Sequence, residues 1–243
     1  MASYYPRAFC RAIRPASRAS LSYQRRVTPL LRRGLVLPAQ QPRLRLGSVA
    51  PNFQAKTTHG DIDFHKFLDG KWCVLFSHPA DFTPVCTTEL GAFARLKPEF
   101  DARGVQMIGL STNDLTSHDE WVSDINKVSN ITVQFPIIAD ADRATGGIAF
   151  TIRSVFIIDP AKKIRLTMTY PASTGRNTSE VLRVIDGLEL ADKKGIATPI
   201  DWTTGDDVIV PPSVSTEDAK NKFGDGNVKE VKRYLRFVDG KGI

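Results

Sequence analysis

The sequence has no long apolar run, no internal repeat and no low-complexity tract, and its 243 residues include only 3 cysteines. A membrane-spanning helix needs about 20 consecutive apolar residues, so we expect no membrane span. Three cysteines are too few for a disulfide framework in a chain of this length. The composition, with 42% hydrophobic and 24% charged residues, is that of an ordinary globular protein with one sizeable domain and an appendage, or two small domains.

Acidic residues are absent from the first 60 positions, which carry 11 Arg or Lys. Residues 61–243 therefore hold 22 basic and 26 acidic residues, so the net charge of +7 belongs to the N-terminus. A nucleic-acid-binding protein should carry its basic face on the folded part. We therefore expect no nucleic-acid partner.

The N-terminal stretch has the composition of a mitochondrial transit peptide, rich in arginine and serine and free of acids. Its first arginines recur every three or four residues, at Arg7, Arg11, Arg14 and Arg18. We expect residues 1–40 to be a disordered presequence that is removed after import into mitochondria. The matrix is the expected compartment. A disordered basic tail without a targeting role is the alternative. Cys10 would leave with the presequence.

From about residue 47 onward, short apolar runs alternate with longer amphipathic ones, which predicts an α/β fold with helices on the faces of a central sheet. Strands are expected at 72–79, 105–112, 134–140, 154–160 and 162–171. Helices are expected at 87–104, 118–128 and 178–195, the last with Thr178 as its N-cap. We predict a main domain over 45–195 and a C-terminal arm over 196–243, which is rich in Pro, Gly and Asp.

The segment HPADFTPVCTTEL, residues 78–90, lies between the first strand and the long helix. Thr83 followed by Pro84 predicts a helix start, because a hydroxyl residue suits the N-cap and proline suits the first helical position. Cys86 is then the third helical residue, where free backbone N–H groups and the helix dipole favour a thiolate. Cys73 lies inside the apolar strand, and we expect it to pack there without reacting.

The spacing P-x-x-x-T-x-x-C, filled by Pro79, Thr83 and Cys86, resembles the active-site motif of peroxiredoxins. The longer string SHPADFTPVCTTELG resembles the one-cysteine, peroxiredoxin-six-like subfamily of mitochondrial type, and the likeness extends from about Gly47 through YPASTGRN and ATPIDW to YLRF. The resemblance implies a thioredoxin-like fold with a mixed β-sheet, a C-terminal arm and a homodimer. It also implies an antioxidant peroxidase acting on hydrogen peroxide and organic hydroperoxides.

The resemblance also implies the catalytic roles. Cys86 would attack the peroxide and become a sulfenic acid, Thr83 would align sulfur and peroxide, and Pro79 would shield the thiolate from water. Arg153 matches the family's active-site arginine, whose charge would stabilise the thiolate and the transition state.

Three further residues resemble side chains that lie next to the active site in this family. Arg176, in TGRN, resembles a second arginine that Glu89 would orient. His78 resembles a histidine beside the site, although a hydrogen bond at a strand end explains it equally well. The other histidines, His59, His65 and His118, show no ligand spacing. We expect no metal and no bound cofactor.

No cysteine follows Cys86 in the sequence, so an external thiol must reduce the sulfenic acid. Glutathione with a helper enzyme and a thioredoxin-like protein are both candidates. A thiol–disulfide oxidoreductase is an alternative function, although such proteins usually need C-x-x-C and Glu89 stands at that position. A chaperone with the same fold is another.

The sequence departs from the family pattern in two places. Some one-cysteine peroxiredoxins carry a phospholipase site, but here Lys71 stands at its serine position and Ala161 at its aspartate position, so we expect no lipase activity. The segment between Asp140 and Arg153 is also shorter than in the family. A natural compact variant, a lost exon and a splice form are all compatible with that difference, and any of them would bear on how Arg153 reaches the site.

Overall fold

The computed structural model describes residues 44–141 and 152–243. The expected presequence (1–40) and most of the shortened segment between Asp140 and Arg153 lie outside these ranges. Within the described residues, no helix combines the length and apolar character needed to cross a bilayer.

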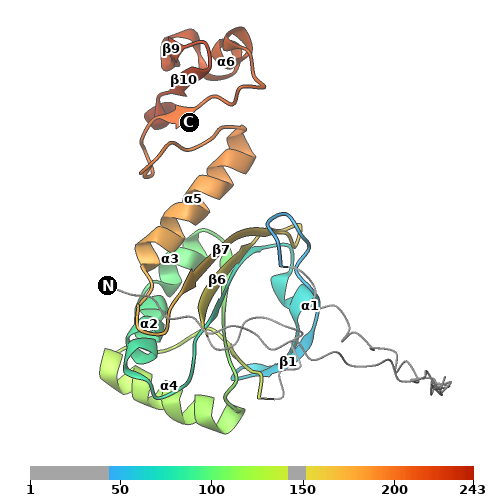
Figure 1. The fold of residues 1–243 in the computed structure, drawn as a ribbon, viewed down its shortest axis with the longest axis vertical. Helices are drawn as coiled ribbons and strands as arrows, with labels where there is room; N and C mark the ends of the chain where they lie inside the picture. Colours follow the sequence, from blue (N-terminus) through green and yellow to red (C-terminus); the bar gives the residue numbers. More distant parts are fainter. Residues whose placement is uncertain (1–43, 142–151) are drawn as a thin grey trace, which may run out of the picture. The chain divides into compact units, whose positions relative to one another are not determined.

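A seven-stranded mixed sheet in the order β2-β1-β5-β4-β3-β6-β7 forms the centre of the main domain (Figure 1). Strands β3, β4 and β5 run parallel, whereas β6 and β7 pair antiparallel on one side and β1 and β2 on the other. The predicted mixed sheet is therefore confirmed. The strands are β1 (Gln54–Thr57), β2 (Gly60–Asp63), β3 (Trp72–Ser77), β4 (Val105–Ser111), β5 (Ile137–Ala139), β6 (Arg153–Ile158) and β7 (Ile164–Tyr170).

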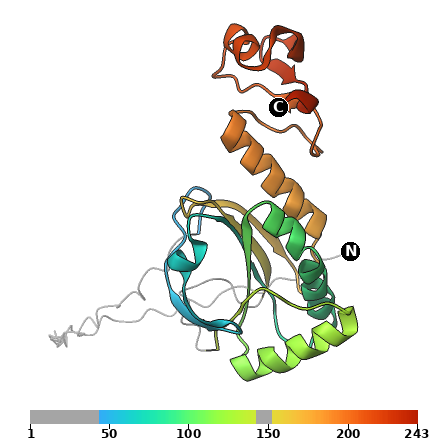
Figure 2. The same ribbon diagram turned by 180° about the vertical axis from the view of Figure 1, so that it is seen from behind.

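The central strands are apolar on both faces because helices cover both faces of the sheet. Alternate residues of β3 enter different cores: Val74 and Phe76 face one, Cys73 and Leu75 the other. The first core is completed by α2 (Pro84–Arg95), α3 (Lys97–Ala102), α4 (Leu115–Ser129) and α5 (Thr178–Lys194), and the second by α1 (Phe64–Leu68). Figure 2 shows α1 on the opposite side of the sheet from α2, α3 and α4.

Two details of the predicted helices were wrong. The helix expected over 87–104 is divided at Leu96 into α2 and α3, because Pro98 lacks the N–H that would continue the hydrogen-bond ladder. The N-cap of α5 is Asn177, one residue before Thr178, and its side chain accepts hydrogen bonds from the backbone N–H groups of Ser179 and Glu180.

The C-terminal region contains a separate three-stranded sheet in the order β8-β10-β9. Its elements are β8 (Val208–Ile209), α6 (Thr216–Phe223), β9 (Val228–Lys232) and β10 (Leu235–Val238), with 3-10 turns at Asp225–Asn227 and Gly240–Gly242. Trp202, Val208 and Val238 belong to its small core, against which Leu190 and Ala191 of α5 pack. The arm thus shares its core with the last helix of the main domain.

Candidate active site

Cys86 lies in the first turn of α2, directly after the loop that follows β3. Thr83 has extended backbone angles and Pro84 is the first helical residue, so Cys86 is third in the helix, as the sequence predicts. Its side chain is fully buried. Phe82 in the same loop has a φ of 54°, a left-handed conformation that costs a phenylalanine about 1–3 kcal/mol and that surrounding structure must enforce.

Thr83 does not cap the helix with its side chain. Its hydroxyl instead donates to the carbonyl oxygen of Ala80, at 3.1 Å. The backbone N–H groups of the first turn, next to Cys86, are therefore left without that acceptor and can face an anion. Pro79 lies half-buried in the same loop.

Arg153 reaches Cys86 from the first residue of β6. Because β3 and β6 are antiparallel and pair Phe76 with Val155, the start of β6 lies beside the end of β3. The Nη1 atom of Arg153 lies 3.1 Å from Cys86 Sγ. Its Nε and Nη2 atoms both donate to the carbonyl oxygen of Ala172, at 3.2 and 2.9 Å, which fixes the guanidinium plane.

Glu89, one helical turn after Cys86, binds two arginines. Its Oε2 atom accepts from Arg153 Nη1 at 2.6 Å and from Arg176 Nη2 at 2.8 Å. Its Oε1 atom accepts from the backbone N–H of Arg176 at 2.7 Å and from Nε at 3.1 Å. Arg176 also donates to the carbonyl oxygens of Ser77 and Ser154.

The charged side chains of this buried cluster do not balance one another. Burial lowers the pKa of the Arg176 guanidinium, Glu89 opposes that shift, and the charge of Arg153 adds to it. Arg153 and Arg176 carry two positive charges and Glu89 carries one negative charge, all three being buried. A thiolate at Cys86 would bring the cluster to neutrality.

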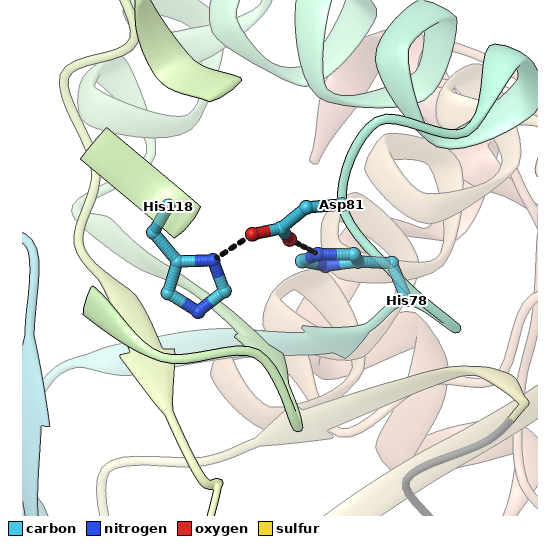
Figure 3. Close-up of side chains that lie close together, drawn as sticks. All are labelled: His78, Asp81 and His118. Carbon is cyan, nitrogen blue, oxygen red and sulfur yellow. Dashed lines mark hydrogen bonds and ion pairs between the residues drawn. The ribbon is translucent and has the colours of Figure 1, made fainter. Parts of the chain in front are cut away.

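A second buried group begins in the loop that joins β3 to α2. Asp81 lies between two imidazole rings (Figure 3): its Oδ1 atom is 2.9 Å from His78 Nε2, and its Oδ2 atom is 2.7 Å from His118 Nδ1. Burial alone would raise the pKa of the Asp81 carboxyl, but hydrogen bonds from His118, His78 and Ser117 outweigh it and lower the pKa. Burial lowers the pKa of His78, which its bond to Asp81 only partly opposes.

Sequence reasoning missed Asp81 and His118. The spacing of His78 and Asp81 within one loop was a usable signal, but His118 comes from α4 and only the fold brings it to Asp81. The three side chains offer ligand atoms within 4.8 Å of one another and could hold a metal ion. Such an ion would have to replace the protons that now lie between the carboxylate and the rings.

Cys73 is buried in β3, where burial raises the pKa of its thiol. This outcome confirms the expected packing position. Cys73 belongs to one core and Cys86 to the other, on opposite faces of the sheet.

Comparisons with known proteins give consistent results. The model of the AhpC/TSA family matches residues 46–167, and that of the C-terminal domain of 1-Cys peroxiredoxin matches residues 187–226. The chain is 56% identical over 220 residues to the mitochondrial peroxiredoxin PRX1 of Saccharomyces cerevisiae, covering 84% of each chain. It is 47% identical over 219 residues to peroxiredoxin-6 of Gallus gallus, covering 81% of this chain and 98% of that one.

Two solved structures resemble the chain closely. One describes the thiol resolving mechanism of a yeast mitochondrial 1-Cys peroxiredoxin via glutathione/thioredoxin systems; it has a TM-score of 0.75 and 55% identity, over 81% of this chain and 99% of that one. The other is a mutant of peroxiredoxin 6 from Arenicola marina, with a TM-score of 0.75 and 44% identity, over 81% of this chain and 98% of that one. These likenesses confirm the expected thioredoxin-like fold.

Proposed function

Because the chain belongs to the one-cysteine peroxiredoxins, and is therefore a thiol peroxidase, we propose that Cys86 is the residue that reduces the peroxide. The observation that carries this assignment is the hydrogen bond from Arg153 to Cys86 Sγ, at 3.1 Å, inside a buried cluster that lacks one negative charge. Such a bond is charge-assisted when the sulfur is a thiolate.

We propose the following reaction at this site. The thiolate of Cys86 attacks the distal oxygen of the hydroperoxide ROOH, an S–O bond forms and the O–O bond breaks. The leaving oxygen takes up the proton that the thiol has lost and departs as ROH, while Cys86 becomes a sulfenic acid. Arg153 stabilises the negative charge as it passes from sulfur to oxygen. Thr83 aligns the peroxide, and Pro79 keeps bulk water from the sulfur.

The sulfenic acid is reduced by a thiol from outside the chain. Cys73 cannot serve, because the sheet separates it from Cys86 and the α carbons of a disulfide must approach to about 4.4–6.8 Å. Glutathione and a thioredoxin-like protein are the proposed reductants, since the yeast relative is described with both systems. A homodimer is proposed on the family resemblance.

We place the mature protein in the mitochondrial matrix. The acid-free, arginine-rich residues 1–40 and the mitochondrial yeast relative support this location. Fusing residues 1–40 to a fluorescent reporter tests it: import and cleavage are expected, and a cytosolic, uncleaved reporter would contradict the presequence.

Stopped-flow measurement of peroxide consumption with the full chain tests the assignment of Cys86. Cys86→Ser should abolish turnover, because a serine hydroxyl without an activating base is a far weaker nucleophile than a thiolate. Cys73→Ser is the matched control and should retain it. Equal loss in both variants would refute the one-cysteine assignment.

The same protein tests the two alternatives and the expected lack of lipase. Reduction of a disulfide substrate in the absence of peroxide would favour a thiol–disulfide oxidoreductase. We expect no such reduction, because Glu89 occupies the position of the second cysteine of C-x-x-C and binds two arginines. Protection of an aggregating client by Cys86→Ser would show an added chaperone role. Acyl hydrolysis lost with Lys71→Ala would overturn the expected absence of phospholipase activity.

A further inference from the structure

The Nδ1 atom of His78 is a buried polar atom without a hydrogen-bond partner among the described residues. The other ring nitrogen, Nε2, lies 2.9 Å from the carboxylate of Asp81. An ionised carboxylate only accepts hydrogen bonds, so Nε2 carries a proton. The neutral ring then has a bare lone pair on Nδ1. A buried acceptor left without a donor is unfavourable, and it indicates that a donor belongs there.

The Asp81 carboxylate that fixes this ring is held from α4. Its Oδ2 atom accepts from His118 Nδ1 and from the Ser117 hydroxyl, both at 2.7 Å. The opposite nitrogen of His118, Nε2, lies 3.1 Å from the carbonyl oxygen of Ile138 in β5. Figure 3 shows the resulting row, in which the carboxylate separates the two rings. The position of the His78 ring proton on Nε2 thus depends on Asp81, which two side chains of α4 hold in place.

Two neighbours of His78, Ser77 and Trp121, link it to the proposed catalytic cluster. Arg176 donates to the carbonyl oxygen of Ser77, the residue before His78, at 2.8 Å. The His78 ring lies 4.9 Å from the ring of Trp121, whose Nε1 atom donates to the hydroxyl of Thr87, the residue after Cys86.

We propose that Asp81 and His118 are positioning residues of the peroxidase reaction. They hold His78 with its proton on Nε2, so that the Nδ1 lone pair accepts a hydrogen bond from the hydroxyl of the distal peroxide oxygen. That oxygen is the one transferred to Cys86, and it keeps its proton as the hydroxyl of the sulfenic acid. A single acceptor can therefore hold the same O–H group before and after transfer. This inference rests on the proposed role of Cys86.

Asp81→Asn tests the inference in the full chain. The asparagine amide can donate to His78 Nε2, which would shift the ring proton to Nδ1 and remove the acceptor, as an aspartate-to-asparagine change does in a serine protease triad. The ¹⁵N chemical shifts of labelled histidine distinguish the two tautomers, and a His78→Asn sample assigns the signals. We expect the tautomer to change and the rate of Cys86 oxidation by hydrogen peroxide to fall about fivefold to tenfold, as for one lost hydrogen bond.

Two substitutions of His118 provide a matched pair that does not alter Asp81. His118→Asn places an amide NH₂ near the position of Nδ1 and keeps a donor for Asp81, whereas His118→Gln keeps only the donor for Ile138. We expect a rate within about twofold of wild type for His118→Asn and a loss resembling that of Asp81→Asn for His118→Gln. His65→Gln is a further control, because His65 bonds the carbonyl oxygen of Ala50 in another part of the domain, and it should change neither the rate nor the His78 tautomer.

The outcomes separate this inference from the proposed function. Activity that survives Cys86→Ser would refute the proposed function. If Cys86 is essential but Asp81→Asn shifts the tautomer without slowing oxidation, or slows it without shifting the tautomer, the positioning role is wrong. Equal rates for His118→Asn and His118→Gln would also refute it, and this pair decides the matter if Asp81→Asn does not fold. Stoichiometric metal in the purified protein, lost with His118→Gln, would assign the three side chains to an ion instead.

Discussion

Glu89 offers the sharpest test of how the site is held together. It is a buried carboxylate in contact with two buried guanidinium groups, at 2.6 Å from Arg153 and 2.8 Å from Arg176. Glu89→Gln keeps the length and shape of the side chain and removes its charge. The two cations would then face each other with only the proposed thiolate of Cys86 as a counter-charge.

The expected cost follows from the burial of all three groups. Removing one partner of a buried ion pair typically destabilises a protein by about 3–5 kcal/mol, because the remaining charge is left uncompensated. The proposed thiolate would offset part of this cost, so we expect a loss of about 3 kcal/mol in the free energy of unfolding. With a urea m-value of about 2–3 kcal/mol/M, the midpoint of unfolding should fall by about 1–1.5 M.

Urea unfolding followed by circular dichroism measures this change, with all variants at one protein concentration. Glu99→Gln is the matched control: Glu99 is 57% exposed and pairs with Arg103 at 2.9 Å on the surface, where such a pair contributes less than about 1 kcal/mol. Adding Cys86→Ser should destabilise Glu89→Gln more than it destabilises the wild type, since both anions are then absent. A Glu89→Gln variant as stable as Glu99→Gln would refute the charge balance described for the site.

Three further predictions concern single side chains. Arg153→Lys should slow Cys86 oxidation by about 10²–10³-fold in stopped flow. The reason is that the planar guanidinium bonds both the sulfur and the carbonyl oxygen of Ala172, whereas an ammonium group cannot keep this geometry. An unchanged rate would contradict the role of the arginine. Gly91→Ala would bring a methyl group against the Ser129 hydroxyl and to 3.0 Å from Ser129 Cβ, and should cost about 1–3 kcal/mol in thermal unfolding; failure of Ser129→Gly to restore stability would show that this contact is not the cause. Burial lowers the pKa of His78 from 6.5, so below that pH the unfolded chain binds more protons than the folded chain, and the free energy of unfolding falls. His78→Asn should therefore reduce the loss of stability measured between about pH 7.5 and 5.5. An identical loss of stability in the variant would contradict a lowered pKa for His78.

Local chemistry made much of the site predictable. Thr83, Pro84 and Cys86 lie within one helical turn, so their arrangement depends on capping preferences and on the fixed φ of proline. The apolar run around Cys73 predicted a strand buried on both faces, because successive side chains of a strand point to opposite faces of the sheet. The break at Leu96 was also local, and attention to Pro98 would have predicted it.

The remaining geometry depends on which strands become neighbours. Arg153 reaches Cys86 because β6 pairs with β3 in a register that sets Phe76 opposite Val155. His118 reaches Asp81 because α4 packs beside α2 on the same face of the sheet. A single sequence does not encode such long-range pairings in any local pattern. The sequence by itself thus predicted the nucleophile, its helix and, through the family resemblance, the charged residues beside it, whereas only the tertiary structure decided their distances and brought His118 to Asp81.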